Sequence, residues 1–208
     1  GKVQFVSNWG WPDELPMWTW PGRDGQPMTV RVYARAERVE LVLNGVKVAE
    51  RALGLGEKVP IEFEVPYAAG SLEAIAWRGG RAVGRRRLDT AGPPAALRLA
   101  PEHRQGSADR QALHYVAVDV VDAAGRIVPE DARPITLAVS GPAQLVAFGS
   151  ANPQAVGSLQ ALTAQSFRGR ALAILRSAGT AGTIRVAASA AGLRGASAGI
   201  TLVQENVA

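Results

Sequence analysis

Apolar and polar residues alternate with a period of two along most of this chain, in short runs that glycine and proline separate. Residues 28–35 and 113–121 are two long runs of this kind. A period of two sends successive side chains to opposite faces of a strand, so that one face can be buried while the other meets solvent. No stretch shows the period of about 3.6 residues that marks an amphipathic helix. The pattern therefore predicts an all-β protein.

The strongest turn signal is Asn44-Gly45, which separates residues 39–43 from residues 46–49. Both residues tolerate the positive φ of a type I′ turn, so the sequence predicts a β-hairpin here. Short strands separated by glycine and proline turns are typical of a β-sandwich. Further strands are expected at residues 59–65, 71–77, 82–88, 97–99, 113–121, 135–139, 144–148, 170–175, 183–188 and 198–202.

A linker is expected at residues 91–95, which read Ala-Gly-Pro-Pro-Ala. Paired prolines cannot donate to a central strand ladder, and they stiffen a connection. A chain of 208 residues has room for two small domains around this point. We therefore predict two consecutive immunoglobulin-like β-sandwich domains. The first covers residues 1–91 and includes a tryptophan-rich N-terminal segment, and the second, immunoglobulin-like or invasin-like, covers residues 95–208.

The net charge of +5 and the isoelectric point of 10.2 raise the question of nucleic-acid binding. Arginines are spread through every segment, and only Arg85-Arg86-Arg87 forms a dense run. A nucleic-acid interface usually clusters its basic residues on one element, so no nucleic-acid partner is expected. No apolar run is long enough to span a membrane, and no membrane partner is expected either.

The first ten residues, GKVQFVSNWG, lack the basic and then apolar plan of a signal peptide, and they do not begin with Met. We therefore expect a processed protein or a piece excised from a longer one. Cysteine is absent, which excludes disulfides and thiolate metal sites.

Few side chains are arranged as catalytic groups. His103 and His114 lack the spacing of metal ligands or of a general-base pair, so structural or solvent-exposed roles are favoured for both. Ser107, Ser140 and Ser166 have no evident triad partner. Acidic residues that a calcium ion could share form no compact loop signature. They are Asp109, Asp119, Asp122, Glu130 and Asp131. We expect no catalytic residue, no cofactor and no metal site, and we interpret residues 149–153 as a tight turn rather than a ligand loop.

Four of the five tryptophans, Trp9, Trp11, Trp18 and Trp20, lie within the first twenty residues, in a segment that proline and glycine interrupt. Indole rings are costly to leave in water, so this segment must contact its own domain, a sugar or another part of a longer protein. Packing on the first sandwich is favoured for Trp18 and Trp20. For Trp9 and Trp11, self-packing and contact with an absent neighbour are equally favoured.

Several segments resemble, in the same order, the region that follows the catalytic barrel in bacterial β-galactosidases of glycoside hydrolase family 2. In the first half they are residues 18–22 (WTWPG), 30–33 (VRVY), 39–45 (VELVLNG), 65–67 (VPY), 70–74 (GSLEA) and 90–94 (TAGPP). In the second half they are residues 113–122 (LHYVAVDVVD), 139–142 (VSGP) and 167–172 (FRGRAL), which resemble the C-terminal immunoglobulin-like domain of that family. Each motif is moderately specific, and the ordered series covers nearly the whole chain.

The resemblance implies a retaining glycosidase whose two catalytic glutamates lie on a TIM barrel, with the carboxyl groups about 5 Å apart. Such a barrel takes roughly 250 residues of alternating strand and helix, which this chain lacks. No catalytic position of the family can be carried over. The resemblance therefore implies a non-catalytic accessory region whose partner is the missing barrel of the same polypeptide. That region would stabilise the barrel and help to shape its cleft or a subunit contact.

Two other functions remain open at this point. A carbohydrate-binding module would use exposed tryptophans or loop residues, with carbohydrate as its partner. An adhesin-like structural array would show self-similar repeats between the two halves, which the sequence does not. A homo-oligomer contact also stays open. The parent is expected to be bacterial, with the periplasm or the extracellular space favoured over the cytoplasm.

Overall fold

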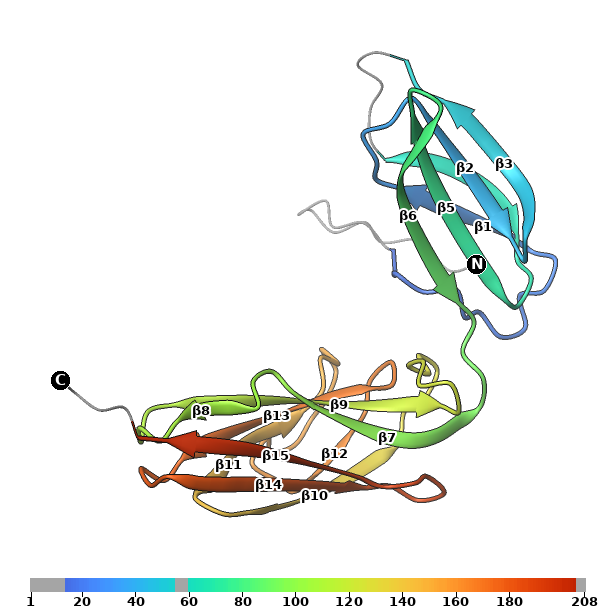
Figure 1. The fold of residues 1–208 in the computed structure, drawn as a ribbon. Coiled ribbons are helices and arrows are strands. Elements are labelled where there is room, and N and C mark those ends of the chain that lie inside the picture. Colours follow the sequence, from blue (N-terminus) through green and yellow to red (C-terminus); the bar gives the residue numbers. More distant parts are fainter. Residues whose placement is uncertain (1–13, 55–59, 205–208) are drawn as a thin grey trace. The chain divides into compact units, whose positions relative to one another are not determined.

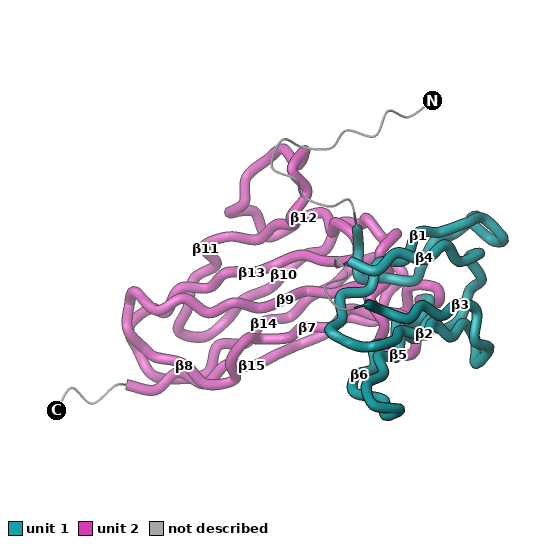
Figure 2. The backbone as a smooth tube through the Cα atoms, turned by 90° about the horizontal axis from the view of Figure 1, so that it is seen from above, with its two compact units in different colours: residues 1–90 teal, residues 91–208 magenta. Residues whose placement is uncertain are grey.

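The computed structural model describes residues 14–54 and 60–204, and β-strands are the only regular elements over these residues. The strands form several sheets (Figure 1), which confirms the prediction of an all-β protein with immunoglobulin-like sandwiches. The chain divides into two compact units, residues 1–90 and residues 91–208 (Figure 2).

Unit 1 contains two antiparallel sheets. Strands β2, β3, β5 and β6 form a four-stranded sheet in the order β3-β2-β5-β6, while β1 and β4 pair with each other. The strands are β1 (Pro27–Val32), β2 (Arg38–Leu43), β3 (Val46–Ala52), β4 (Ile61–Pro66), β5 (Ser71–Arg78) and β6 (Arg81–Asp89). Alternate residues of β2 and β4, such as Val39, Leu41, Ile61 and Phe63, point into one shared core. The period of two in the sequence thus becomes the inner and outer faces of a small sandwich.

The predicted hairpin is confirmed. Asn44 and Gly45 have φ angles of 52° and 84°, as a type I′ turn requires, and they connect β2 to β3. The Asn44 side chain also holds the turn that precedes β5. Its Oδ1 accepts the Ser71 N–H at 2.8 Å, and its Nδ2 donates to the Ala69 carbonyl at 2.9 Å. One asparagine therefore shapes its own turn and fixes a second one.

Among the described glycines of unit 1, Gly70 is the one where an added side chain would overlap most. Its φ of +131° lies in a region that only glycine adopts readily, and a Cβ built there would overlap the Asn44 carboxamide. We expect Gly70→Ala to lower the free energy of unfolding by about 2 kcal/mol, because it adds backbone strain and displaces Asn44. Urea unfolding followed by tryptophan fluorescence measures this loss. Gly25→Ala is the control, since Gly25 has φ +75° with open space around it, and an equal loss there would contradict the role given to Asn44.

Unit 2 is a sandwich of a five-stranded and a four-stranded sheet. The strand orders are β12-β10-β14-β15-β8 and β11-β13-β9-β7, and every pairing is antiparallel except that of β8 with β15. The strands are β7 (Pro94–Pro101), β8 (Gln105–Ser107), β9 (Leu113–Asp122), β10 (Pro134–Ser140), β11 (Ala143–Gly149), β12 (Thr163–Gln165), β13 (Arg170–Ser177), β14 (Gly182–Ser189) and β15 (Ala196–Val203). Val118 of β9, Leu137 of β10, Phe148 of β11 and Ile184 of β14 are among the side chains buried between the sheets.

The structure begins β7 at Pro94, inside the predicted linker. Pro94 pairs with Asp122, and the register then shifts before Ala96. Because β7 is the edge strand of its sheet, a residue without an N–H is tolerated there. The short strands β8 and β12 were not predicted, since three residues are too few to show a period.

Candidate functional site

Trp18 is a core residue of unit 1. Its side chain is 2% exposed, and its ring centroid lies 5.1 Å from that of Tyr67 in a tilted arrangement. The indole Nε1–H donates to the Ala68 carbonyl at 3.0 Å, and the Trp18 carbonyl accepts the Thr90 hydroxyl at 2.6 Å. These contacts satisfy the indole N–H and the backbone carbonyl of Trp18. The alternative of self-packing therefore holds for Trp18, and almost none of its surface is left for a sugar.

Trp20 is half-buried and packs on the edge of the same core. Its backbone N–H donates to the Tyr67 hydroxyl at 3.1 Å, and its carbonyl accepts the Arg23 N–H at 3.2 Å. The backbone is thus fixed while part of the ring remains accessible. Trp9 and Trp11 lie outside the described residues, so the contact roles expected for them stay predictions.

Trp77 is a tryptophan to which the sequence analysis gave no role. It lies on β5, and the Arg38 guanidinium carbon is 4.7 Å from its ring centroid, a cation–π contact. Its Nε1 is buried and has no hydrogen-bond partner among the described residues. The long side chain of Arg38 therefore covers an indole on the outer face of the four-stranded sheet.

The basic run at residues 85–87 lies on the edge strand β6. Arg85 pairs with Glu73 at 3.1 Å and Arg87 with Asp89 at 2.8 Å. Alternation along the strand places Arg86 on the opposite face. Two of the three positive charges are thus balanced by carboxylates on the same unit. This arrangement is typical of a solvated face.

The two histidines do not come together. His103 is exposed, whereas His114 is 8% exposed at the start of β9. A Cβ on Gly106 would overlap the His114 imidazole, so the glycine lets the backbone of β8 lie directly against the ring. The Nε2 atom of His114 is buried without a partner among the described residues. His114 is therefore a packed structural residue.

His114 should make the stability of unit 2 sensitive to pH. Burial lowers the pKa of the imidazole, and a hydrogen bond with the backbone of Ser107 offsets this only in part. The unfolded chain, with a histidine pKa of about 6.5, takes up the proton first as the pH falls. We therefore expect full stability above that value and a progressive loss as the pH falls from it through the lower folded-state pKa.

Urea unfolding of unit 2 at several pH values tests this expectation. His114→Gln should flatten the pH dependence in this window, while His103→Gln should leave the wild-type profile intact. If the His114→Gln profile matched that of the wild type, another group would be responsible.

Four of the five acidic candidates for a calcium site have separate partners, and the fifth, Glu130, is exposed. Asp119 pairs with Arg98 at 2.7 Å, and Asp131 pairs with Arg133 at 2.5 Å. Asp122 accepts hydrogen bonds from three backbone N–H groups. Across residues 14–54 and 60–204, no three His, Cys, Asp or Glu side chains are grouped so that they could hold a metal ion.

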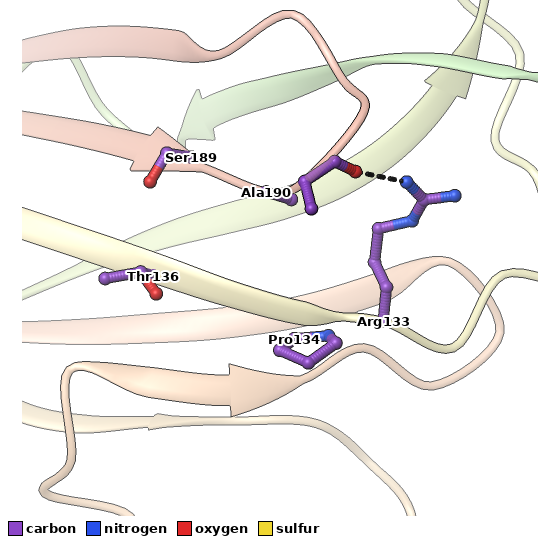
Figure 3. A pocket seen from close by; sticks show the side chains of 6 residues that line it. Arg133, Pro134, Thr136, Ser189 and Ala190 are labelled. Carbon is purple, nitrogen blue, oxygen red and sulfur yellow. Dashed lines mark hydrogen bonds between the residues drawn. The ribbon is translucent and has the colours of Figure 1, made fainter.

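A shallow pocket of about 430 Å³ lies at the ends of β10 and β14 (Figure 3). Arg133 reaches across it and donates to the Ala191 carbonyl at 2.9 Å, and the same guanidinium binds the Asp131 carboxylate. Its charge is therefore already balanced. Thr136 and Ser189 add hydroxyl groups to the lining, and none of the lining residues is an acid, a histidine or an aromatic residue. The lining therefore provides no base that could activate these hydroxyls and no aromatic ring on which a sugar could stack.

Residues 149–153 start the connection between β11 and β12. The Asn152 side chain accepts the Gln154 N–H at 3.0 Å, which forms a local turn. The connection is longer than the tight turn expected, because β12 begins only at Thr163.

Ser166 has a structural role, because its Oγ accepts a hydrogen bond from the Arg133 backbone N–H at 3.1 Å.

Across the described residues, no helix has the length and apolarity that a membrane crossing needs.

Family models match part of each half of the chain. The family model of the glycoside hydrolase family 2 C-terminal domain 5 matches residues 97–199. A model of a domain of unknown function (DUF4982) matches residues 25–84.

Similar proteins extend over both units. The β-galactosidase BoGH2A of Bacteroides ovatus is 27% identical over 198 residues, which cover 92% of this chain and 23% of that protein. A protein of Formosa agariphila provisionally named a β-glucuronidase is 29% identical over 141 residues, 67% of this chain and 14% of that protein. A crystal structure of a glycosyl hydrolase family 2 member from Bacteroides cellulosilyticus has a TM-score of 0.88 at 32% identity, over 95% of this chain and 26% of that one. The chain thus spans about a quarter or less of the length of these relatives.

Proposed function

The chain belongs to the C-terminal region of glycoside hydrolase family 2, and we propose that it is a non-catalytic accessory region of its parent enzyme. Its two units would pack against the catalytic barrel and stabilise it. Two observations together carry the proposal. The chain matches only about a quarter of the length of its relatives, and its buried acids already have structural partners. Every buried carboxylate among the described residues, those of Asp119, Asp122 and Asp131, is held by arginine or by backbone N–H groups.

The pKa values of Glu50 and Asp122 are shifted in the direction opposite to that needed by a catalytic acid. A retaining glycosidase needs two carboxyl groups about 5 Å apart, and the one that donates a proton needs a raised pKa. Here Lys47 and Arg38 lower the pKa of Glu50. For Asp122, burial alone would raise the pKa, but its hydrogen bonds with the backbone outweigh that effect and lower it. Both acids therefore favour the ionised form, which suits ion pairing and not proton donation.

We further propose that the parent is a retaining β-galactosidase. BoGH2A, which matches over 92% of this chain, bears that name. The relative from Formosa agariphila makes β-glucuronides the second substrate class to test.

Two measurements test the accessory role. The purified 208-residue chain should not turn over a chromogenic β-galactoside or β-glucuronide, and turnover that survives purification would refute the proposal. In the parent polypeptide, removal of this region should lower the unfolding temperature of the barrel. Adding the separate chain back should restore part of that temperature, which distinguishes lost docking from a misfolded truncation.

Carbohydrate binding is the competing function, and the accessible part of the Trp20 ring is the observation that favours it. Aromatic rings stack on the C–H face of sugars. Isothermal titration with galactose, lactose and plant oligosaccharides measures this directly. Saturable binding by the wild type that Trp20→Ala abolishes would establish a binding module, whereas no heat change leaves the accessory role alone.

A further inference from the structure

The two outer faces of the unit 2 sandwich differ in chemistry. On the five-stranded sheet, most residues that point away from the core are small or carry hydroxyl groups. Thr136, Thr183, Ser189, Ser197 and Thr201 are examples, and all are exposed. Such a face is well suited to water. The outer face of the five-stranded sheet can therefore serve as the solvent-exposed comparison for the outer face of the four-stranded sheet.

The four-stranded sheet presents an apolar outer face. Leu113 and Tyr115 of β9 and Leu172 of β13 are 41%, 38% and 42% exposed. The register places Ile174 directly opposite Tyr115, and Ala147 of β11 opposite Ile174 on its other side. Large apolar side chains thus lie next to each other on β9 and β13, and the small Ala147 continues the apolar surface onto β11. A contiguous patch of this kind on a soluble domain usually marks a contact surface.

A loop residue extends this patch. Phe148 is buried in the core, so the next residue, Gly149, faces outward, opposite Leu172. A Cβ on Gly149 would overlap the Leu159 side chain, so Leu159 lies on the outer face in the space that the glycine leaves. Leu159 nevertheless remains 58% exposed. We call the set Leu113, Tyr115, Ala147, Leu159, Leu172 and Ile174 the apolar face.

Arginines border the apolar face at both ends. At one end, Asp119 forms ion pairs with Arg98 at 2.7 Å and with Arg170 at 4.0 Å. At the other end, Arg176 is exposed and forms no ion pair with any described residue. Two guanidinium groups therefore share one carboxylate, and the third, that of Arg176, has none among the described residues. A partner that fits this face is apolar at its centre and carries carboxylates at its rim.

We propose that the apolar face docks on the catalytic part of the same family 2 polypeptide, at a surface with those properties. The proposal rests on the accessory function proposed above and names the face that performs it. About three quarters of each matched relative lies outside the region shared with this chain, so a large partner surface is supplied in cis. A covalently linked partner has a high effective concentration, so a patch of modest size is enough.

Two other occupants fit this face less well. A second copy of the chain would bring the unpaired Arg176 and the arginine-rich rim against an identical positive surface. A sugar would find one aromatic ring, Tyr115, among aliphatic side chains that offer no hydrogen bonds.

Hydroxyl-radical footprinting tests the proposal, with the 208-residue chain and its full-length parent compared at equal concentration. Labelling of Leu172 and Tyr115 should fall by about fivefold or more in the parent, as expected for burial in an interface core. Val203 is the matched control because it is 39% exposed on the outer face of the other sheet, and its labelling should not change. Unchanged labelling of Leu172 and Tyr115 would overturn the proposal. The proposal would also be overturned if the decrease in labelling depended on protein concentration, or if Leu172 and Tyr115 were already protected in the separate chain. Either result would indicate contact with a second copy of the chain.

Variants connect the face to the function. Leu172→Ser should lower the unfolding temperature of the barrel in the parent while leaving that of the separate chain within error, and Val203→Ser should change neither. If removing the whole region destabilises the barrel but Leu172 is labelled equally in both proteins, the accessory function stands and the assigned face is wrong. If Leu172 is protected but removal of the region leaves the barrel equally stable, the docking stands and the stabilising function is wrong.

Discussion

Replacing Trp18 by alanine is expected to unfold unit 1 under conditions in which unit 2 stays folded. The indole is 2% exposed, donates to the Ala68 carbonyl and packs on Tyr67. Truncating a buried aromatic side chain usually costs about 3–5 kcal/mol, because it leaves a cavity and loses apolar burial. Small domains have total stabilities of about 5–10 kcal/mol, and unit 1 has the smaller of the two buried clusters. The substitution therefore removes most of its stability.

The distribution of aromatic residues makes this prediction easy to follow. All five tryptophans precede residue 91, so tryptophan fluorescence during urea unfolding reports on unit 1 alone. Amide hydrogen exchange in β9 and β13 reports on unit 2. Trp20→Ala is the control, and its half-buried ring should cost only about 1–2 kcal/mol. Equal losses in the two variants would contradict the core role of Trp18.

Local sequence signals predicted the strands well where they were long. The hairpin at Asn44-Gly45 follows from the positive φ that both residues accept, and β5 extends one residue beyond its predicted end. The early start of β7 at Pro94 was missed because proline is excluded only from central strands, and the sequence does not reveal that β7 lies at an edge. Strand order is set by long-range packing, which local patterns do not contain.

The tryptophan segment and the apolar face show different limits of sequence reasoning. Nothing local distinguishes Trp18 from Trp20, since their burial depends on Tyr67 and Thr90, which lie far away in the sequence. The apolar face did leave a signal. Residues 170–176 read RALAILR, in which Ala171, Ala173 and Leu175 fill the core while Leu172 and Ile174 face outward. A strand that is apolar on both faces is typical of one covered on both sides.

Asp122 is expected to be the most important polar side chain of unit 2. Its Oδ1 accepts the backbone N–H groups of Ala124 and Arg126 at 2.9 and 2.8 Å, and its Oδ2 accepts that of Gly92 at 2.8 Å. The residue is 4% exposed. Asp122→Ala leaves three N–H groups without their acceptor, which should lower the free energy of unfolding of unit 2 by about 3 kcal/mol or more. Asp109→Ala is the control, because Asp109 is exposed and accepts one N–H, that of Gln111.

The ionisation of Asp122 also makes the stability of unit 2 depend on pH, which allows a second, independent test. Burial opposes ionisation, but the hydrogen bonds from Gly92, Arg126 and Ala124 prevail and lower the pKa of the carboxyl group. The unfolded chain, with an aspartate pKa of about 3.9, takes up the proton first as the pH falls. Stability is therefore complete above that value and declines as the pH falls through the lower folded-state pKa. Hydrogen exchange in β9 measured against pH should show this decline in the wild type.

Asp122→Asn separates the charge from the hydrogen bonds. The amide oxygen can replace Oδ1 and accept from Ala124 and Arg126, but the amide nitrogen would then face the Gly92 N–H, where two donors meet. The stability of this variant should lie between those of the wild type and Asp122→Ala, and it should lose the wild-type decline in acid. An asparagine variant as stable as the wild type would show that Gly92 does not depend on Asp122. The start of β7 would then be held by its ladder with β9 alone.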